Sequence, residues 1–187
     1  PPGGELAVVS VVFVDVRGFT SLSERLPPGE IVARLNRFYK VAADVVFDLD
    51  GTFDKAVGDQ VMAFFGAPFR PEDHAQRAVT AAIWIIKTLE DMAEDEEFLR
   101  VGGGVGTGET YMGNVAEGEV RDFTVIGDIV NTAARLQSLA GPGEVMIMED
   151  TYKWLTEEYS GAVQSSVEIR GKSEPVAVRV INVRDTE

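Results

Sequence analysis

The chain has 187 residues, enough for one domain with a substantial core, and its 17 Lys and Arg against 31 Asp and Glu give a formal net charge of −14 at pH 7. A surface this negative would repel a phosphate backbone or an anionic lipid surface, so neither nucleic acid nor a membrane is an expected partner. With no cysteine and one histidine, the sequence excludes a disulfide framework, a thiolate nucleophile and a zinc site of Cys or several His ligands, so any metal would be held by oxygen.

The first predicted strand is a buried one that ends in a carboxylate. Leu6 to Asp15 is β-branched and almost wholly apolar, and at Arg17-Gly18-Phe19-Thr20 the chain turns into a helix. From Glu30 onward, apolar residues recur at helical spacing until Asp50-Gly51 ends the pattern. A strand, a turn and a long amphipathic helix are therefore expected in this order.

A hairpin is the strongest local signal in the chain. Two short strand-like runs, Thr52 to Val57 and Gln60 to Phe65, flank Gly58-Asp59, which places Asp59 at the tip. A second long amphipathic helix follows and runs into the acidic stretch Glu90 to Glu97, for which a solvated helix end or loop is expected.

The second half of the chain continues to alternate strands and helices. The pattern predicts strands at Arg100 to Gly113 and Arg121 to Ile126, a helix from Asp128 to Ala140, a strand at Glu144 to Met148, a short helix from Asp150 to about Glu158, and strands near Val163 to Ile169 and Val176 to Val183. This alternation favours an α+β or α/β fold in which a mixed sheet is covered by helices on one side.

Two carboxylates are candidates for metal binding. Asp15 and Asp59 are 44 positions apart, but a strand end and a hairpin tip can meet if the two elements are adjacent and antiparallel. Paired carboxylates without His or Cys suit Mg²⁺ or Mn²⁺, which also take phosphate oxygens, and so predict two-metal nucleotide chemistry. The alternative is structural, a capping Asp15 and a turn-forming Asp59.

Other polar positions could bind phosphate. The backbone N–H groups of Gly18-Phe19-Thr20 open a helix and could form a phosphate cradle. The Gly-rich run from Gly102 to Gly108 lacks the dinucleotide-binding pattern and is expected to let backbone or substrate approach closely. Asn131 and Arg135 share a helix face, where Asn could orient a sugar and Arg could stabilise charge on a transferring phosphoryl group, unless the face is merely solvated.

Three segments together resemble the class III nucleotidyl cyclases. They are Phe13-Val14-Asp15-Val16-Arg17-Gly18-Phe19-Thr20, Phe53-Asp54-Lys55-Ala56-Val57-Gly58-Asp59, and the run from Asp122 to Leu136. Shorter matches at residues 106–109, 113–115 and 171–176 follow in the family's order, so the likeness covers nearly the whole chain. The resemblance implies an α+β fold with a ferredoxin-like βαββαβ core and additional strands and helices. It also implies conversion of a nucleoside triphosphate to a 3′,5′-cyclic monophosphate and pyrophosphate.

The resemblance also implies residue roles. The family's positions for two divalent metal ions, Mg²⁺ or Mn²⁺, fall on Asp15 and Asp59. Its ribose-positioning residue falls on Asn131, and the arginine that meets charge at the α-phosphate falls on Arg135. The family's base-reading lysine falls on Lys55.

The partner position of that lysine, seven residues before Asn131, falls on Thr124. Many adenylyl cyclases of the family have Asp there, so Thr124 places the chain with a subgroup, some of whose members respond to bicarbonate. Bicarbonate is therefore a candidate activator. Asp122 lies on the same face of the strand and is the alternative partner of Lys55.

The chemistry of these side chains favours ATP over GTP. Lys55 has only donors, which suits N1 of adenine and opposes the N1–H of guanine, and the Thr124 hydroxyl can accept from the adenine amino group. Arg121 and Lys172 are further candidates for contacts with the triphosphate, with a strand-edge arginine and a solvated lysine as the alternatives. His74 is expected to begin a helix without a catalytic role.

A homodimer with shared sites is expected. Lys55 lies four residues before Asp59, yet the base and the phosphates are at opposite ends of a nucleotide. The resemblance implies that one subunit provides the metal-binding carboxylates, and the other provides Lys55, Thr124, Asn131 and Arg135. The alternatives are a guanylyl cyclase, a catalytically silent cyclase-like regulatory or nucleotide-binding module, and a palm-type nucleotidyltransferase. The net charge of −14 disfavours the last of these.

The boundaries of the chain predict its context. No apolar run reaches the roughly 18 residues that a membrane-spanning helix needs, so a cytoplasmic location is expected. The chain begins Pro1-Pro2 without an initiator Met, so residues 1–187 are expected to be a single catalytic domain excised from a longer protein, which could itself be attached to a membrane.

Overall fold

The computed structural model describes residues 4–68, 70–92, 100–117 and 120–186, with the backbone alone for residues 115–117 and 120–123. Its core runs in the order β1 (Glu5–Arg17), α2 (Pro28–Asp48), β2 (Thr52–Val57), β3 (Gln60–Phe65), α3 (His74–Asp91) and β4 (Arg100–Glu117). These strands form the order β2-β3-β1-β4 with antiparallel neighbours. The predicted ferredoxin-like βαββαβ core is therefore confirmed.

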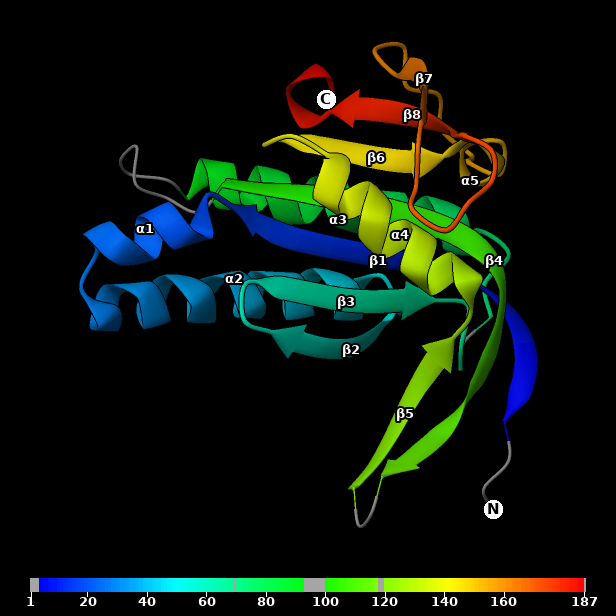
Figure 1. The fold of residues 1–187 in the computed structure, drawn as a ribbon, viewed down its shortest axis with the longest axis horizontal. Coiled ribbons are helices and arrows are strands. Elements are labelled where there is room, and N and C mark those ends of the chain that lie inside the picture. The colour runs from blue at the N-terminus through cyan, green and yellow to red at the C-terminus, as the bar shows by residue number, and fades with distance from the viewer. Residues whose placement is uncertain (1–3, 69, 93–99, 118–119, 187) are drawn as a thin grey trace.

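Further elements extend this core. They are α1 (Phe19–Arg25), β5 (Val120–Ile126), α4 (Asp128–Leu139), β6 (Glu144–Met148), α5 (Glu149–Tyr152), β7 (Val163–Val167), β8 (Val176–Asn182) and the 3₁₀ helix η1 (Val183–Asp185). β6 pairs parallel to β4 and continues the sheet through β8 to β7, while β5 pairs with the far end of β4. In Figure 1 the β4–β5 arm projects away from the body of the sheet.

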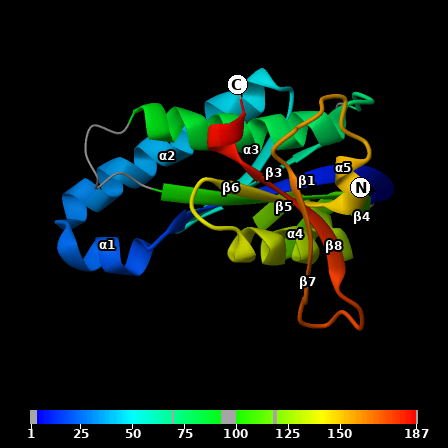
Figure 2. The same ribbon diagram turned by 90° about the horizontal axis from the view of Figure 1, so that it is seen from above.

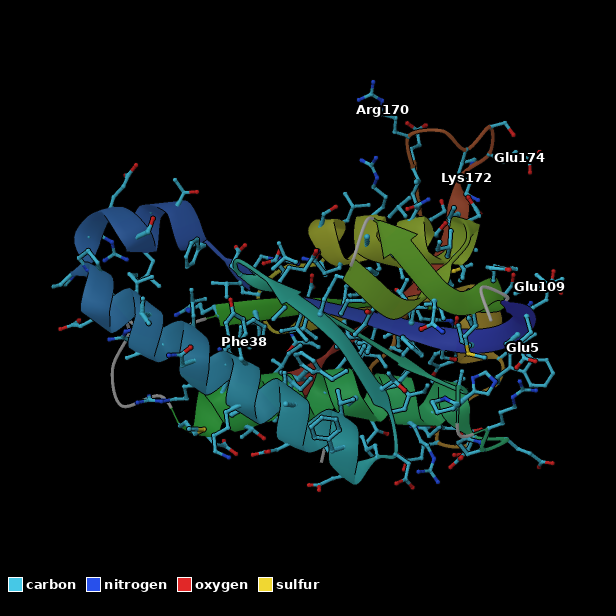
Figure 3. The ribbon with its side chains drawn as sticks, turned by 90° about the horizontal axis from the view of Figure 1, so that it is seen from below. Glu5, Phe38, Glu109, Arg170, Lys172 and Glu174 are labelled. Atoms are coloured by element: carbon cyan, nitrogen blue, oxygen red, sulfur yellow. The ribbon has the colours of Figure 1, made fainter. Side chains whose placement is uncertain are left out.

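Helices cover both faces of the sheet, which corrects the expectation of a single covered face. Side chains alternate along β1, so that Val12, Val14 and Val16 pack toward α2 and α3. Val11 and Phe13 pack on the other side with Ala133 of α4. Figure 2 shows α4 across the sheet from α2 and α3. The fully buried Phe38 of α2 belongs to the hydrophobic core on the side of α2 and α3 (Figure 3). An alternation of strands and helices does not specify the face on which each helix lies.

The glycine-rich run of β4 is what allows α4 to approach the sheet. A Cβ on Gly104 would lie 2.4 Å from the backbone nitrogen of Gln137 and 2.5 Å from the carbonyl oxygen of Ala133. Cβ atoms on Gly106 and Gly108 would meet Ile129, the second residue of that helix. The expected close approach is confirmed: the glycines of β4 lie against the backbone of α4 and against the side chain of Ile129.

The short helix expected from Asp150 to about Glu158 is wrong in length, since α5 ends at Tyr152. The side chain of Gln76, buried in α3, accepts hydrogen bonds from the backbone nitrogens of Thr156 and Glu157, each at 3.0 Å. These N–H groups therefore bond to a side chain about 80 positions away in place of helical carbonyl oxygens. Sequence periodicity cannot reveal such a contact.

The remaining predicted elements occur within a few residues of their expected bounds, and the two hairpin strands and β6 have the predicted bounds. The acidic stretch up to Glu97 lies mostly outside the described residues. Among the helices of the described part of the chain, none combines the length and the apolar character needed to cross a membrane.

Candidate active site

The end of β1 brings the two candidate metal-binding carboxylates together. Asp15 pairs with Gln60 of β3 on one side and with Gly102 of β4 on the other. The backbone nitrogen of Val16 donates to the carbonyl oxygen of Asp59 at 3.0 Å, which holds the hairpin turn against the strand end. The predicted proximity is confirmed, and binding of metal by the pair stays a prediction.

The electrostatics of this pair favour a nearby positive charge. Burial, together with the charge and hydrogen bond of the Asp59 carboxylate, raises the pKa of Asp15 to about 6. Oδ1 of Asp15 is buried and has no hydrogen-bond partner. A buried carboxylate oxygen without a donor is unfavourable, and a divalent cation would satisfy it and cancel the repulsion between the two carboxylates.

The part of the chain that the structure describes offers few protein ligands for such an ion. In the described ranges, no cluster of three or more His, Cys, Asp or Glu side chains could hold a metal. Two carboxylates would therefore need oxygens from water and from substrate phosphates to complete the coordination. Mg²⁺ and Mn²⁺ bind in this way, so the residues fit divalent ions that arrive with a nucleotide.

Arg17, which was not among the predicted site residues, lies close enough to both carboxylates to interact with them electrostatically. Its Nε donates to the carbonyl oxygen of Ala140 at 2.8 Å, and its Nη2 donates to the carbonyl oxygen of Gln137. Burial lowers the pKa of Arg17, against the opposing effect of Asp15 and Asp59. The guanidinium thus joins the end of β1 to the end of α4. An arginine immediately after an apolar strand that ends in Asp was the available signal.

The predicted phosphate-binding turn follows directly. Gly18 precedes α1 with φ of 71°, a left-handed conformation that favours glycine, and no atom outside its neighbours lies within 4 Å of where its Cβ would be. Phe19 packs against the core, while Thr20 is exposed. The space beside the backbone of Gly18 is therefore open, and phosphate binding here remains a prediction.

The helix that carries the predicted transition-state residues presents them to solvent. Asn131 and Arg135 are exposed on α4, whereas Ile129, Ala133 and Leu136 are buried against the sheet. The expected division of this helix into two faces is confirmed. Since both side chains lie on the surface, a nucleotide or a second subunit could reach them.

Of the two candidate triphosphate contacts, one is described in full. Lys172, in the loop between β7 and β8 (Figure 3), forms an ion pair with Asp128, the first residue of α4. The backbone of Arg121 lies in β5, as does that of Asp122, but their side chains are outside what the structure describes. The contact of Lys172 with phosphate therefore stays a prediction, and in this chain the lysine pairs with the helix that carries Asn131 and Arg135.

The predicted base-reading residues lie on two different strands, β2 and β5. Lys55 is exposed on β2, and Thr124 of β5 is 8% exposed. The Thr124 hydroxyl donates to Oδ2 of Asp54 at 2.6 Å. No local pattern marks Asp54 as a site residue, because its contact with Thr124 joins residues 70 positions apart.

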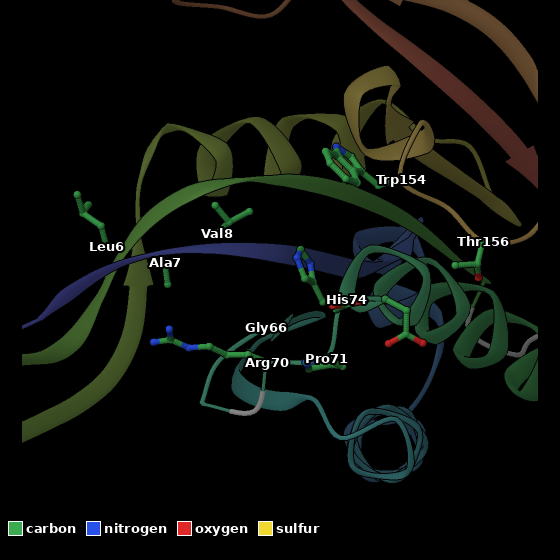
Figure 4. A pocket seen from close by; sticks show the side chains of 11 residues that line it. Leu6, Ala7, Val8, Gly66, Arg70, Pro71, His74, Trp154 and Thr156 are labelled. Carbon is green, nitrogen blue, oxygen red and sulfur yellow. The ribbon is translucent and has the colours of Figure 1, made fainter.

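A wide cavity of about 790 Å³ lies elsewhere, near the start of β1 (Figure 4). Its lining includes Val8, His74 and Trp154, and none of the predicted site residues. His74 begins α3, as expected, and its Nδ1 is 2.8 Å from the Ser10 hydroxyl. This histidine is therefore engaged inside the fold and lies apart from the carboxylate pair.

Comparison with known proteins gives a consistent result. A family model described as the adenylate and guanylate cyclase catalytic domain matches residues 4–182. Two uncharacterized proteins of Mycobacterium tuberculosis, Rv1318c and Rv1320c, are each 36% identical over 93% of this chain. The chain spans about a third of their lengths, 32% and 31%.

Solved structures of both nucleotide specificities resemble the fold. The guanylyl cyclase Cya2 is 30% identical with a TM-score of 0.89, covering 95% of this chain and 93% of that one. The adenylyl cyclase CyaB from P. aeruginosa is 30% identical with a TM-score of 0.85, covering 95% of each chain. A rhodopsin-guanylyl cyclase of converted specificity, in complex with ATPαS, is 25% identical with a TM-score of 0.82, covering 96% of this chain and 98% of that one.

Proposed function

The chain belongs to the adenylate and guanylate cyclase catalytic domain family, and we propose that it is an adenylyl cyclase that converts ATP to 3′,5′-cyclic AMP and pyrophosphate. The observation that carries a cyclisation activity is the pair Asp15 and Asp59, held together at the end of β1 with one buried carboxylate oxygen unpartnered. Class III cyclases generally use divalent metals, and this pair has the oxygen ligands for them.

In the proposed reaction, the ribose 3′-oxygen attacks the α-phosphorus of the same nucleotide, the bond to the β-phosphate oxygen breaks, and the hydroxyl proton is released. Two divalent ions bound by Asp15 and Asp59 would lower the pKa of the 3′-hydroxyl and neutralise the phosphates. Asn131 orients the ribose, and Arg135 meets the charge that grows at the α-phosphate. Pyrophosphate is the leaving group.

The preference for ATP rests on Lys55 and Thr124. The Lys55 ammonium has three donors and no acceptor, so it can bind N1 of adenine but faces a donor at N1 of guanine. The Thr124 oxygen can accept from the adenine amino group. A buried donor that meets another donor loses its partner, and such a mismatch is the usual origin of strong discrimination between substrates.

Assembly of the site requires two copies of the chain. Lys55 lies on the hairpin whose turn carries Asp59, so one chain would bring base and phosphates to nearly the same place. We propose a head-to-tail homodimer in which Asp15 and Asp59 of one subunit act with Lys55, Thr124, Asn131 and Arg135 of the other. The exposed position of the last two on α4 supports this arrangement. Two equivalent sites then lie in one interface.

Two further parts of the proposal concern context. Residues 1–187 would form one catalytic domain of a longer protein, and bicarbonate is a candidate activator. The effect of bicarbonate is measured by adding its sodium salt at constant pH and ionic strength, with sodium chloride as the control. Stimulation by bicarbonate alone supports activation, and equal rates with both salts would remove it from the proposal.

A guanylyl cyclase is the second candidate, since Cya2, a guanylyl cyclase, matches with a TM-score of 0.89. Incubation of the purified chain with ATP or GTP, each with Mg²⁺ or Mn²⁺, and chromatographic detection of the cyclic products distinguishes the two. We expect cyclic AMP in excess. Preferential formation of cyclic GMP would overturn the adenylyl assignment, and no product from either nucleotide at high protein concentration would indicate a silent regulatory module.

A further inference from the structure

The hydroxyl of Thr124 already donates a hydrogen bond within the protein, before any nucleotide is bound. It donates to Oδ2 of Asp54 over 2.6 Å, and the threonine side chain is only 8% exposed. An ionised carboxylate has acceptors and no donor, so in this pair the hydroxyl must be the donor. Hydrogen bonds to a charged partner are stronger than those between neutral groups, which makes this orientation of the hydroxyl the stable one.

An irregularity in β2 accounts for the position of the carboxylate. The register of β2 against β3 shifts between Phe53 and Lys55, which leaves Asp54 as the additional residue of a bulge. A bulge locally redirects side chains that would otherwise alternate between the two faces of a strand. Asp54 can therefore contact β5 while the next residue, Lys55, remains exposed.

We propose that Asp54 is a specificity-determining positioning residue, which holds the Thr124 hydroxyl as an acceptor and so favours ATP over GTP. This inference rests on the proposed function, in which Thr124 faces position 6 of the purine. A threonine hydroxyl has one proton and two lone pairs. With the proton on the side of Asp54, only lone pairs remain for the base. The 6-amino group of adenine donates and matches them, whereas the 6-oxygen of guanine accepts and is repelled.

Without Asp54, threonine alone would discriminate poorly. A free hydroxyl rotates, so it can accept from adenine or donate to the guanine oxygen with similar geometry. The carboxylate removes the second possibility without touching the substrate. Asp54 thus restricts Thr124, which could otherwise donate or accept, to accepting a hydrogen bond from adenine. Lys55 contacts the neighbouring ring nitrogen independently.

The test compares kcat/KM for ATP and GTP in the wild type, Asp54→Ala and a matched control, Asp48→Ala, which removes an exposed carboxylate on α2. For Asp54→Ala we expect the ATP to GTP ratio to fall on the order of 10-fold, chiefly because kcat/KM for GTP rises. The control leaves the ratio unchanged. A purely structural role for Asp54 would lower both rates together and leave the ratio at the wild-type value, which would overturn the inference.

A second comparison, in the Thr124→Val variant, tests whether Asp54 changes the nucleotide ratio through the Thr124 hydroxyl. In Thr124→Val, which removes the hydroxyl, the additional change Asp54→Ala should leave the nucleotide ratio where Thr124→Val alone set it. A further change in the ratio would mean that Asp54 acts on the base by another route and would contradict the inference. If Asp54→Ala does not fold by circular dichroism, Asp54→Asn keeps the size of the side chain. Its amide can donate as well as accept, so the ratio should shift in the same direction by a smaller factor.

This inference and the proposed function can fail separately. A wild-type enzyme that prefers ATP, with an unchanged ratio in Asp54→Ala, would refute the inference alone. If the wild type makes no cyclic product, the proposed function fails. Equilibrium dialysis with ATP and with GTP then decides the inference, since the ratio of the two dissociation constants should again change in Asp54→Ala and not in Asp48→Ala.

Discussion

Two aspartates of the β2–β3 hairpin have opposite surroundings. Asp59, in the turn, lies beside Asp15, whose pKa is raised to about 6 by burial and by the neighbouring carboxylate, and whose Oδ1 has no partner. Asp54, at the bulge, accepts a 2.6 Å hydrogen bond from Thr124. The pair of Asp15 and Asp59 keeps a buried carboxylate oxygen without a donor, which favours the binding of a cation. At the bulge, Asp54 holds the proton of the Thr124 hydroxyl, which in our proposal lets Thr124 discriminate between neutral bases.

The largest expected effect is the loss of activity when a carboxylate of the Asp15–Asp59 pair is removed. Asp15→Asn or Asp59→Asn removes a carboxylate ligand without removing core volume, so we expect cyclisation to fall by at least about 100-fold. The circular dichroism spectrum should stay that of the wild type. Asp48→Asn, an exposed change on α2, is the control and should be fully active. Wild-type activity in either site variant would refute the assignment of these residues as metal ligands.

The second prediction tests whether Asp59 of one subunit and Arg135 of the other act on the same nucleotide. Asp59→Ala and Arg135→Ala should each be inactive alone and recover activity when mixed, because each heterodimer contains one intact site. With equal mixing and free exchange, half of the dimers are mixed and each has one of two sites, so recovery should approach about a quarter of the wild-type activity. Exchange is verified with two affinity tags. Mixed dimers that form but remain inactive would exclude the shared-site arrangement.

The third prediction concerns Lys55, the proposed base-reading lysine. Lys55→Glu replaces donors by acceptors, which suit the N1–H and 2-amino group of guanine, so the ratio of kcat/KM for ATP to that for GTP should fall about 10-fold or more. The dependence of the rate on metal concentration should remain that of the wild type, because the carboxylate pair is untouched. An unchanged nucleotide ratio would show that Lys55 does not contact the base.

The smallest effect concerns stability without metal. The pKa of Asp15 in the fold, about 6, lies above its ordinary value of 3.8, so the free energy of unfolding falls as the pH rises from 3.8 to about 6, and the loss is complete above about 6. Asp15→Asn should then raise the free energy of unfolding at pH 7.5 by about 1 kcal/mol, after allowing for solvent screening. The gain should vanish as the pH falls toward 3.8.

Urea titrations of the metal-free protein at pH 7.5 and pH 4 measure this difference. Asp54→Asn is the matched variant, since its carboxylate is already partnered by Thr124, and we expect no gain in stability from it. An equal gain from both variants would mean that the net charge of the protein is responsible, and that the two carboxylates do not differ in the way described above.

Much of the site could be predicted from local pattern. Gly58-Asp59 between two strand-like runs sets the hairpin because its backbone requirements are met within a few residues. Asn131 and Arg135 lie on the exposed face of α4 because helical periodicity alone separates them from Ile129 and Leu136. The proximity of Asp15 and Asp59 followed from placing one at a strand end and the other at a hairpin tip.

Other features depended on contacts between distant parts of the chain. The bulge at Asp54, the contact of Asp54 with Thr124, and the connection of Arg17 to the end of α4 each join residues 70 or more positions apart or depend on register between strands. The early end of α5 has the same origin, in the hydrogen bonds to Gln76. Periodicity and turn chemistry report the preferences of neighbouring residues, so most of the elements and the residues capable of chemistry could be predicted from the sequence alone. Which of those residues meet is known only from the fold, because hydrogen bonds and burial between distant segments exist only after the sheet has assembled.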